Sequence, residues 1–309
     1  MNKFAKYSIL LGLALIFISV IFSFRNMDQL WQPFASNSRY SYTEHLTENE
    51  IERILIDIHN MRIVIREYDG DYVKIRHPEN EHFRLNESEN TLSLTRDQRN
   101  INNWFSINLN FYIPEVVVMV PSDLILTYDI TTSNARINVR SIAMLESTFR
   151  TSNSVIELRN VISDYTINTR SSNGRIELNN IEAYELIAVT SNARINVDNV
   201  LADSLSLTTS NGRIESNNVE ANVVNFTTSN SRIGFRDLKA NTIDLRSSNG
   251  RIEGTVIGNS EEFQKNIQTS NGRIMLNGQN RGTSVMDNMN AEQTINARTS
   301  NGRIDIDFR

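Results

Sequence analysis

The chain has 309 residues, of which 39% are hydrophobic and 22% charged, with 12 Gly and 4 Pro, so it is a folded protein and neither a disordered nor a collagen-like chain. It contains no cysteine, which excludes disulfides, thiolate metal sites and a cysteine nucleophile, and its 4 histidines leave little material for a metal centre. The formal net charge of -5 argues against nucleic acid as a partner, because phosphate backbones are bound by basic surfaces.

An apolar segment lies near the N-terminus. Residues 8–24 are 17 uncharged positions rich in Leu, Ile and Phe, and Lys3 and Lys6 precede them. As a helix, residues 7–24 would span roughly 27 Å, which nearly matches the hydrocarbon core of a bilayer. Two interpretations stay open, since a cleaved signal peptide also has a basic start and an apolar run. The length of the run and the lack of a good cleavage site favour a retained transmembrane signal anchor.

The lysines before this segment predict its orientation. Basic residues are retained on the cytoplasmic side of a membrane, so residues 1–6 are expected to be a short cytoplasmic tip. We therefore predict a single-pass protein of the cell membrane with its N-terminus in the cytoplasm. Residues 25–48 would form an extracytoplasmic linker to the rest of the chain.

Residues 49–130 are rich in β-strand signals but carry no clear repeat. Alternating apolar and polar residues at 54–58, 61–65 and 91–94 are typical of strands, and Asp69-Gly70 is a hairpin signal. We interpret this region as a degenerate start and cap of the repeat array that follows. A separate small β-domain is the alternative.

A Ser-Asn pair recurs nine times in residues 131–309, with successive Asn residues 19, 20, 19, 19, 19, 19, 22 and 30 positions apart. Counted from this Asn, position +3 is always Ile, position +2 is Arg in eight copies, and position -2 is always Thr or Ser. Apolar and polar positions alternate with the two-residue period of a strand. Each unit is thus predicted to be a strand, a Ser-Asn turn, a second strand and a second turn such as Asn179-Asn180.

A unit of about 19 residues cannot bury its own apolar face, so the copies are expected to stack. The predicted fold is all-β, a parallel β-solenoid in which equivalent residues form ladders about 4.8 Å apart, preceded by one transmembrane helix. The Ile column is the predicted core. The Asn column is predicted to point inward at a corner and to form a structural amide ladder. This Asn ladder consists of Asn134, Asn153, Asn173, Asn192, Asn211, Asn230, Asn249, Asn271 and Asn301.

The Arg column at +2 is predicted to face solvent and is the candidate binding surface. Eight guanidinium groups in one row, about 4.8 Å apart, match the charge of an extended anionic cell-wall polymer such as a teichoic acid well but its spacing poorly. The alternative is structural, because Glu or Asp at +4 in five copies can neutralise the row through surface ion pairs. The least neutralised members are expected to be Arg194, beside Asn196, and Arg232, beside Gly234. The Arg ladder consists of Arg136, Arg175, Arg194, Arg213, Arg232, Arg251, Arg273 and Arg303.

The repeat motif carries a family resemblance. With units such as Ser171–Leu178, and with residues 111–122 carrying Val-Pro near their end, residues 50–309 resemble a bacterial putative-adhesin family of exported or membrane-anchored β-solenoids. The single N-terminal anchor resembles one branch of it, encoded beside a cell-envelope-stress two-component system in Gram-positive bacteria. The resemblance implies adhesion and supplies no catalytic residues.

Together these features predict a non-enzymatic protein without catalytic residues, cofactor or metal. Its acids are spread one per coil rather than clustered as in glycoside-cleaving enzymes, and His77 and His82 are interpreted as part of a solvated turn. Two functions stay open: a cell-envelope binding or adhesin-like surface that uses many weak contacts, and an accessory of an envelope-stress system that acts through a membrane protein partner. The last strand, Arg303–Phe308, is also expected to be an open edge that permits self-association.

Overall fold

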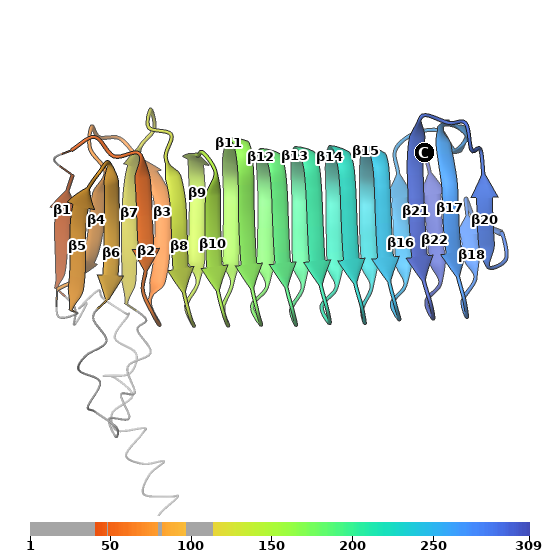
Figure 1. Cartoon of the computed structure of the whole chain (residues 1–309), viewed down its shortest axis with the longest axis horizontal. Helices are drawn as coiled ribbons and strands as arrows, with labels where there is room; N and C mark the ends of the chain where they lie inside the picture. The colour runs from red at the N-terminus through yellow and green to blue at the C-terminus, as the bar shows by residue number, and fades with distance from the viewer. Residues whose placement is uncertain (1–40, 48, 80–81, 97–113) are drawn as a thin grey trace, which may run out of the picture. The chain divides into compact units, whose positions relative to one another are not determined.

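The computed structural model describes residues 41–47, 49–79, 82–96 and 114–309. Residues Tyr42–Arg309 form one compact unit, an all-β solenoid of mostly parallel strands stacked in a long row (Figure 1). This confirms the predicted all-β solenoid. The predicted transmembrane segment, residues 7–24, lies outside the described residues. Within the part of the chain that the structure describes, no helix has the length and apolar character needed to cross a membrane.

Five long strands form the centre of the solenoid. Each pairs in parallel with the next, and the register follows the sequence repeat, so that Ile176, Ile195 and Ile214 are partners on adjacent coils. The sequence period of 19 residues is therefore one turn of the solenoid. These strands are β11 (Ile156–Ser171), β12 (Ile176–Thr190), β13 (Ile195–Thr209), β14 (Ile214–Thr228) and β15 (Ile233–Ser247).

A left-handed residue bends each central strand. Asn160, Asn180, Asn199, Asn218 and Asp237 have φ between 50° and 55°, a conformation that Asn and Asp tolerate better than most residues because their short polar side chains bond locally. In β12 to β15 the arm before this bend follows the Arg at +2, and the rest of the strand ends in the next Thr or Ser at -2. The predicted second turn is thus a corner of the coil.

The predicted Ile column is the centre of the core. All nine Ile residues at +3 are 0% exposed. The Thr and Ser residues at -2 are also buried. In the central coils their hydroxyls bond the turn of the preceding coil, as Thr190 Oγ1 donates to the Gly174 carbonyl (3.1 Å) and Thr209 Oγ1 to the Ala193 carbonyl (3.2 Å), whereas Thr132 Oγ1 has no partner among the described residues. These buried hydroxyls satisfy the polarity of the turns inside an otherwise apolar core.

At the N-terminal end, the coils are not stacked in sequence order. The coil of β2 and β3 lies between the coil of β8 and β9 and that of β6 and β7, and it pairs in parallel with both. Antiparallel strands β1, β4 and β5 cover this end. The strands are β1 (Tyr42–Leu46), β2 (Arg53–Asp57), β3 (Arg62–Tyr68), β4 (Lys74–Pro78), β5 (Phe83–Ser88), β6 (Thr91–Arg96), β7 (Glu115–Pro121), β8 (Thr127–Thr132), β9 (Ile137–Ala143) and β10 (Ser147–Thr151).

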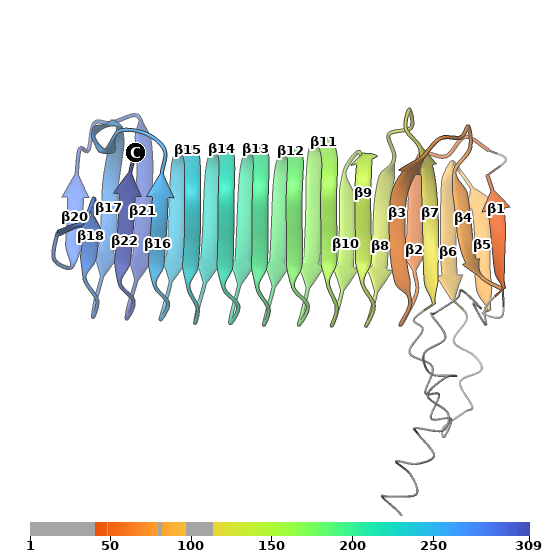
Figure 2. The same cartoon turned by 180° about the vertical axis from the view of Figure 1, so that it is seen from behind.

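At the C-terminal end, too, the coils are not stacked in sequence order. The last repeat, β21 and β22, is inserted between the coil of β15 and β16 and that of β17 and β18 (Figure 2). The prediction that Arg303–Phe308 forms an open edge is therefore wrong, because β22 is paired on both sides. The remaining elements are β16 (Ile252–Val256), the short 3-10 helix Ser260–Glu262, β17 (Phe263–Thr269), β18 (Ile274–Leu276), β19 (Gln279–Asn280), β20 (Ser284–Asp287), β21 (Gln293–Thr299) and β22 (Ile304–Phe308).

Candidate functional site

The eight Arg residues at +2 stand on one outward surface, formed by β9, the first arms of β11 to β15, β16, β22 and β18. We call this surface the arginine face. Six of these side chains are exposed, and Arg136 and Arg303 are half-buried. Because the last repeat is inserted, Arg303 lies between Arg251 and Arg273 in the stack rather than at its end.

Ion pairs neutralise much of this ladder. Surface pairs of this kind contribute little to stability, but they occupy both the guanidinium and the carboxylate. Five of the eight arginines have a carboxylate partner: Arg136 with Glu157 (3.7 Å), Arg175 with Glu177 (2.8 Å), Arg232 with Glu215 and with Glu253 (2.8 Å), Arg251 with Glu253 (3.0 Å), and Arg303 with Asp305.

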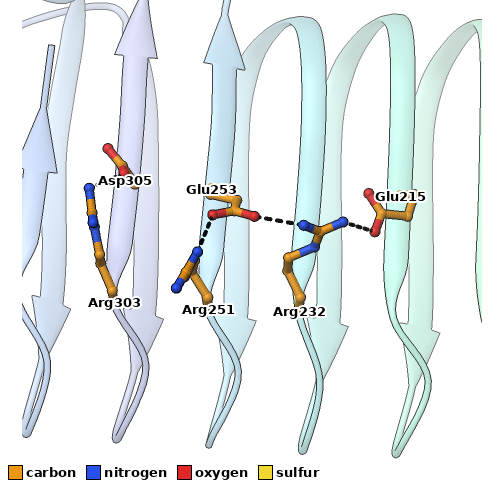
Figure 3. A network of polar contacts seen from close by, with 6 residues as sticks. All are labelled: Glu215, Arg232, Arg251, Glu253, Arg303 and Asp305. Atoms are coloured by element: carbon orange, nitrogen blue, oxygen red, sulfur yellow. Dashed lines mark hydrogen bonds and ion pairs between the residues drawn. The ribbon is translucent and has the colours of Figure 1, made fainter. Parts of the chain in front are cut away.

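Arg232 is the most extensively paired member, so the prediction that it is among the least neutralised is wrong. Its guanidinium bridges Glu215 on one neighbouring coil and Glu253 on the other (Figure 3). The hydrogen bond with Glu215 raises the pKa of Arg232. Gly234 explains why Arg232 is paired although it was expected to be free, because a Cβ at Gly234 would lie 2.6 Å from Glu215 Oε2. The missing side chain lets the carboxylate reach across to the next coil.

Three ladder arginines, Arg194, Arg213 and Arg273, make no ion pair with any described residue. The same holds for Arg236, at position +6, which lies with Arg194 and Arg213 in the centre of the arginine face. For Arg194 this agrees with the expectation. Arg213 lacks a partner because Glu215, two residues along its own strand, is engaged by Arg232. Arg236 was not predicted as a site residue, because position +6 does not repeat one residue type and gives no periodic signal.

Arg194, Arg213 and Arg236 line one shallow groove across the arginine face, with a volume of about 600 Å³. We call it the arginine groove. Two polar atoms of its lining, Ser216 Oγ and Asn196 Oδ1, are buried without a hydrogen-bond partner among the described residues. Ser216 is only 6% exposed and occupies an inward position that Val197 fills on the adjacent coil. Unsatisfied buried polar atoms are costly, so both are notable beside a cationic groove.

The predicted Asn ladder forms, but its predicted inward orientation is wrong. All nine Asn side chains are exposed, and eight Nδ2 to Oδ1 bonds of 2.6 to 2.9 Å join them along the stack. The Ser-Asn turn reverses the alternation, so that the Thr or Ser at -2 takes the inward position. The ladder also continues to Asn60, which accepts from Asn134 at 2.5 Å.

No group of three His, Asp or Glu side chains in the described part of the chain lies close enough together to hold an ion. His77 packs against the ring of Phe83, with ring centroids 4.7 Å apart.

Comparison with known proteins found similar solved structures and one family model. Solved structures similar to this chain include a putative adhesin from Bacteroides fragilis (11% identity, 87% of this chain and 97% of that chain, TM-score 0.40). A putative adhesin from Parabacteroides distasonis has 9% identity, 88% and 98% coverage and a TM-score of 0.40. A putative cell adhesion protein from Clostridium sporogenes has 10% identity, 88% and 100% coverage and a TM-score of 0.23. A search of curated proteins found no match.

The family comparison covers nearly all of the solenoid. Residues 51–307 match the family described as Toastrack DUF4097. The predicted resemblance to a putative-adhesin family is thereby confirmed. Because the match extends over most of its length, this chain belongs to the Toastrack DUF4097 family.

Proposed function

We propose that this protein is a non-enzymatic, adhesin-like binding module and that its arginine groove binds an anionic polymer of the cell envelope. One observation carries the proposal: the unpaired Arg194, Arg213 and Arg236 line a single groove. The groove's two glutamates, Glu215 and Glu253, are already engaged by ladder arginines. An incoming anion would therefore meet uncompensated positive charge.

The distribution of ion pairs supports a short binding site rather than a track along the whole rod. Arg194 and Arg213 are on adjacent coils, about 4.8 Å apart in backbone spacing. Arg236 lies on the next coil and about 13 Å further along the strand direction, at four residues of roughly 3.3 Å each. Guanidinium groups bind phosphate and carboxylate oxygens through paired hydrogen bonds. A segment of polymer with two or three anionic groups fits this spacing.

The proposed setting is the outer face of the cytoplasmic membrane, with residues 7–24 as a single-pass anchor. An anchored rod would hold the groove within the envelope, where anionic polymers are abundant. The alternative role, as an accessory of an envelope-stress system acting through a membrane protein, is an outcome of the test below.

The test is sedimentation of the full chain, in mild detergent, with purified cell-wall sacculi that carry or lack teichoic acid, across a salt series. The groove variant is Arg194→Gln with Arg213→Gln and Arg236→Gln. The control removes three paired arginines, Arg136→Gln with Arg175→Gln and Arg251→Gln. We expect binding that requires the polymer, weakens with salt and is lost only in the groove variant.

Equal losses in the two variants would mean that net charge, and not the groove, drives binding. No binding to any sacculi would contradict the polymer function. In that case, chemical crosslinking at the membrane would be the way to identify a protein partner.

A further inference from the structure

A second groove follows the left-handed corner of the central coils and shares no lining residue with the arginine groove, although its Asn218 is next in the chain to Asn217 of the arginine groove. Its volume is about 530 Å³, and four successive coils, β11 to β14, contribute to it. We call it the corner groove. One side carries an amide ladder, Asn160, Asn180, Asn199 and Asn218, and the other carries the outward residues two positions further along, Ile162, Glu182, Leu201 and Glu220.

The amide ladder leaves regular hydrogen-bonding capacity in the groove. Asn180 Nδ2 donates to Asn160 Oδ1 (2.8 Å), Asn199 to Asn180 (3.0 Å) and Asn218 to Asn199 (2.8 Å). An amide group has two N–H donors and an oxygen with two lone pairs. The ladder uses one donor and one lone pair of Asn180 and of Asn199. Each of these exposed amides can therefore still donate once and accept once.

Apolar side chains are exposed beside these amides. Ile162 and Leu201 are 53% and 49% exposed and lie on opposite sides of Glu182 in the same column. Tyr165 and Tyr184, 53% and 61% exposed, follow this column on adjacent coils. Tyrosine offers an apolar ring face together with a polar hydroxyl. Exposed apolar side chains gathered at a groove mark a contact surface.

The charges and the backbone pairing restrict the class of ligand. Among the described residues that line the corner groove there is no lysine or arginine, and Glu182 makes no ion pair with the described chain, so anions are disfavoured. Strands β11 to β14 are paired on both sides, so the groove has no free strand edge to which a peptide could add. Exposed amides beside apolar side chains suit an uncharged ligand with many hydroxyls and apolar C–H faces.

We propose that the corner groove binds an uncharged oligosaccharide lying along the rod axis. Its hydroxyls bond the amides of Asn180 and Asn199 and the carboxylate of Glu182. The C–H faces of its rings pack against Ile162 and Leu201. The regular spacing of the amides, about 4.8 Å, matches a ligand built from repeating units of similar length. This site is independent of the arginine groove.

The test is isothermal titration calorimetry of the full chain, in mild detergent, with three neutral hexasaccharides: cellohexaose, chitohexaose and laminarihexaose. We expect at least one to bind. The variant Ile162→Ala with Leu201→Ala should weaken that binding at least tenfold. Alanine removes the apolar contacts without placing new carboxylates directly beside Glu182 and Glu220, where like charges would repel. The matched control is Ile125→Ala with Ile257→Ala, two exposed positions outside the groove, and it should bind like the wild type.

Three results would overturn the proposal. The first is no binding of any of the three hexasaccharides at millimolar concentration. The second is an equal loss of affinity in the corner-groove variant and in its control, with unchanged circular dichroism. The third is loss of oligosaccharide binding in the arginine-groove variant with full retention in the corner-groove variant.

Discussion

Gly212 shows how closely two coils approach at the Ser-Asn turn. An ideal Cβ on Gly212 would lie 1.6 Å from the carbonyl oxygen of Ala193. We expect Gly212→Ala to lower the free energy of unfolding by about 1–3 kcal/mol, since the turn must shift to admit the methyl group. Urea unfolding followed by circular dichroism measures this change. The control is Ala193→Gly, at the same turn position of the neighbouring coil, and its cost should stay under about 1 kcal/mol. Equal costs would contradict the close approach.

Tyr128 gives the fold a dependence on high pH. Its ring is 1% exposed, and its hydroxyl has no hydrogen-bond partner among the described residues. Burial raises the pKa of Tyr128 above its ordinary value of about 10. The unfolded phenol ionises from about pH 10 while the folded one stays neutral, so stability is present below pH 10 and falls as the pH rises above it.

Tyr128→Phe should remove this loss of folding stability above pH 10. Thermal unfolding at pH 8 and at pH 11 should show a smaller loss for the variant than for the wild type. At pH 8 the variant should be at least as stable as the wild type, because it no longer buries an unsatisfied hydroxyl. A parallel decline of both proteins between the two pH values would show that Tyr128 ionises equally in the folded and unfolded chain.

At the scale of the strand, the two-residue period predicted most inward and outward positions. It placed the Ile column in the core and the Arg column in solvent, as the structure has them. It failed at Asn211 and its equivalents, because the turn breaks the alternation and only the backbone path decides which side the amide takes. It failed to predict the ion pair of Arg232, because the partner Glu215 lies on another coil and reaches Arg232 across Gly234. Pairing between coils depends on side-chain space that a single strand does not encode.

The two Asn ladders should differ in what they contribute to stability. Asn211 lies in the exposed Ser-Asn turn, bonded to Asn192 and Asn230, each at 2.7 Å. Asn199 makes similar bonds but also has a φ of 54°. Asn211→Ala should cost about 1 kcal/mol, as water replaces the lost bonds. Asn199→Ala should cost about 1–2 kcal/mol more, because alanine is strained in the left-handed region. Chemical unfolding compares the two.

A glycine at the corner separates the ladder from the backbone effect. Asn199→Gly keeps the left-handed conformation but removes the amide. Its stability should therefore lie closer to that of Asn211→Ala than to that of Asn199→Ala. If Asn199→Gly were as unstable as Asn199→Ala, the amide bonds and not the backbone would dominate at this corner.

At the scale of the whole solenoid, the repeat predicts that coils stack but not their order. Copies with the same pattern can exchange places without changing which residues are buried. The two long spacings before Asn271 and Asn301 contain the segments that carry the chain past one coil and back. The intercalation of β2 and β3 left no comparable signal, because residues 49–130 lack the repeat motif. Long-range pairing at both ends therefore emerges only in three dimensions.

Because the last repeat is inserted between two other coils, the stability of the C-terminal coils should depend on it. Removing residues 293–309 would delete β21 and β22 and leave the coil of β17 and β18 without the strands that join it to β15 and β16. Limited proteolysis should then cut within residues 257–292, while β11 to β14 stay protected because their own neighbours are intact. The unpaired strands of β15 and β16 should also promote self-association, which sedimentation velocity would detect. If β17 and β18 instead restacked on β15 and β16, the truncated chain would associate no more than the full chain and would stay protected throughout, and the last repeat would be a dispensable coil rather than the link that holds this end together.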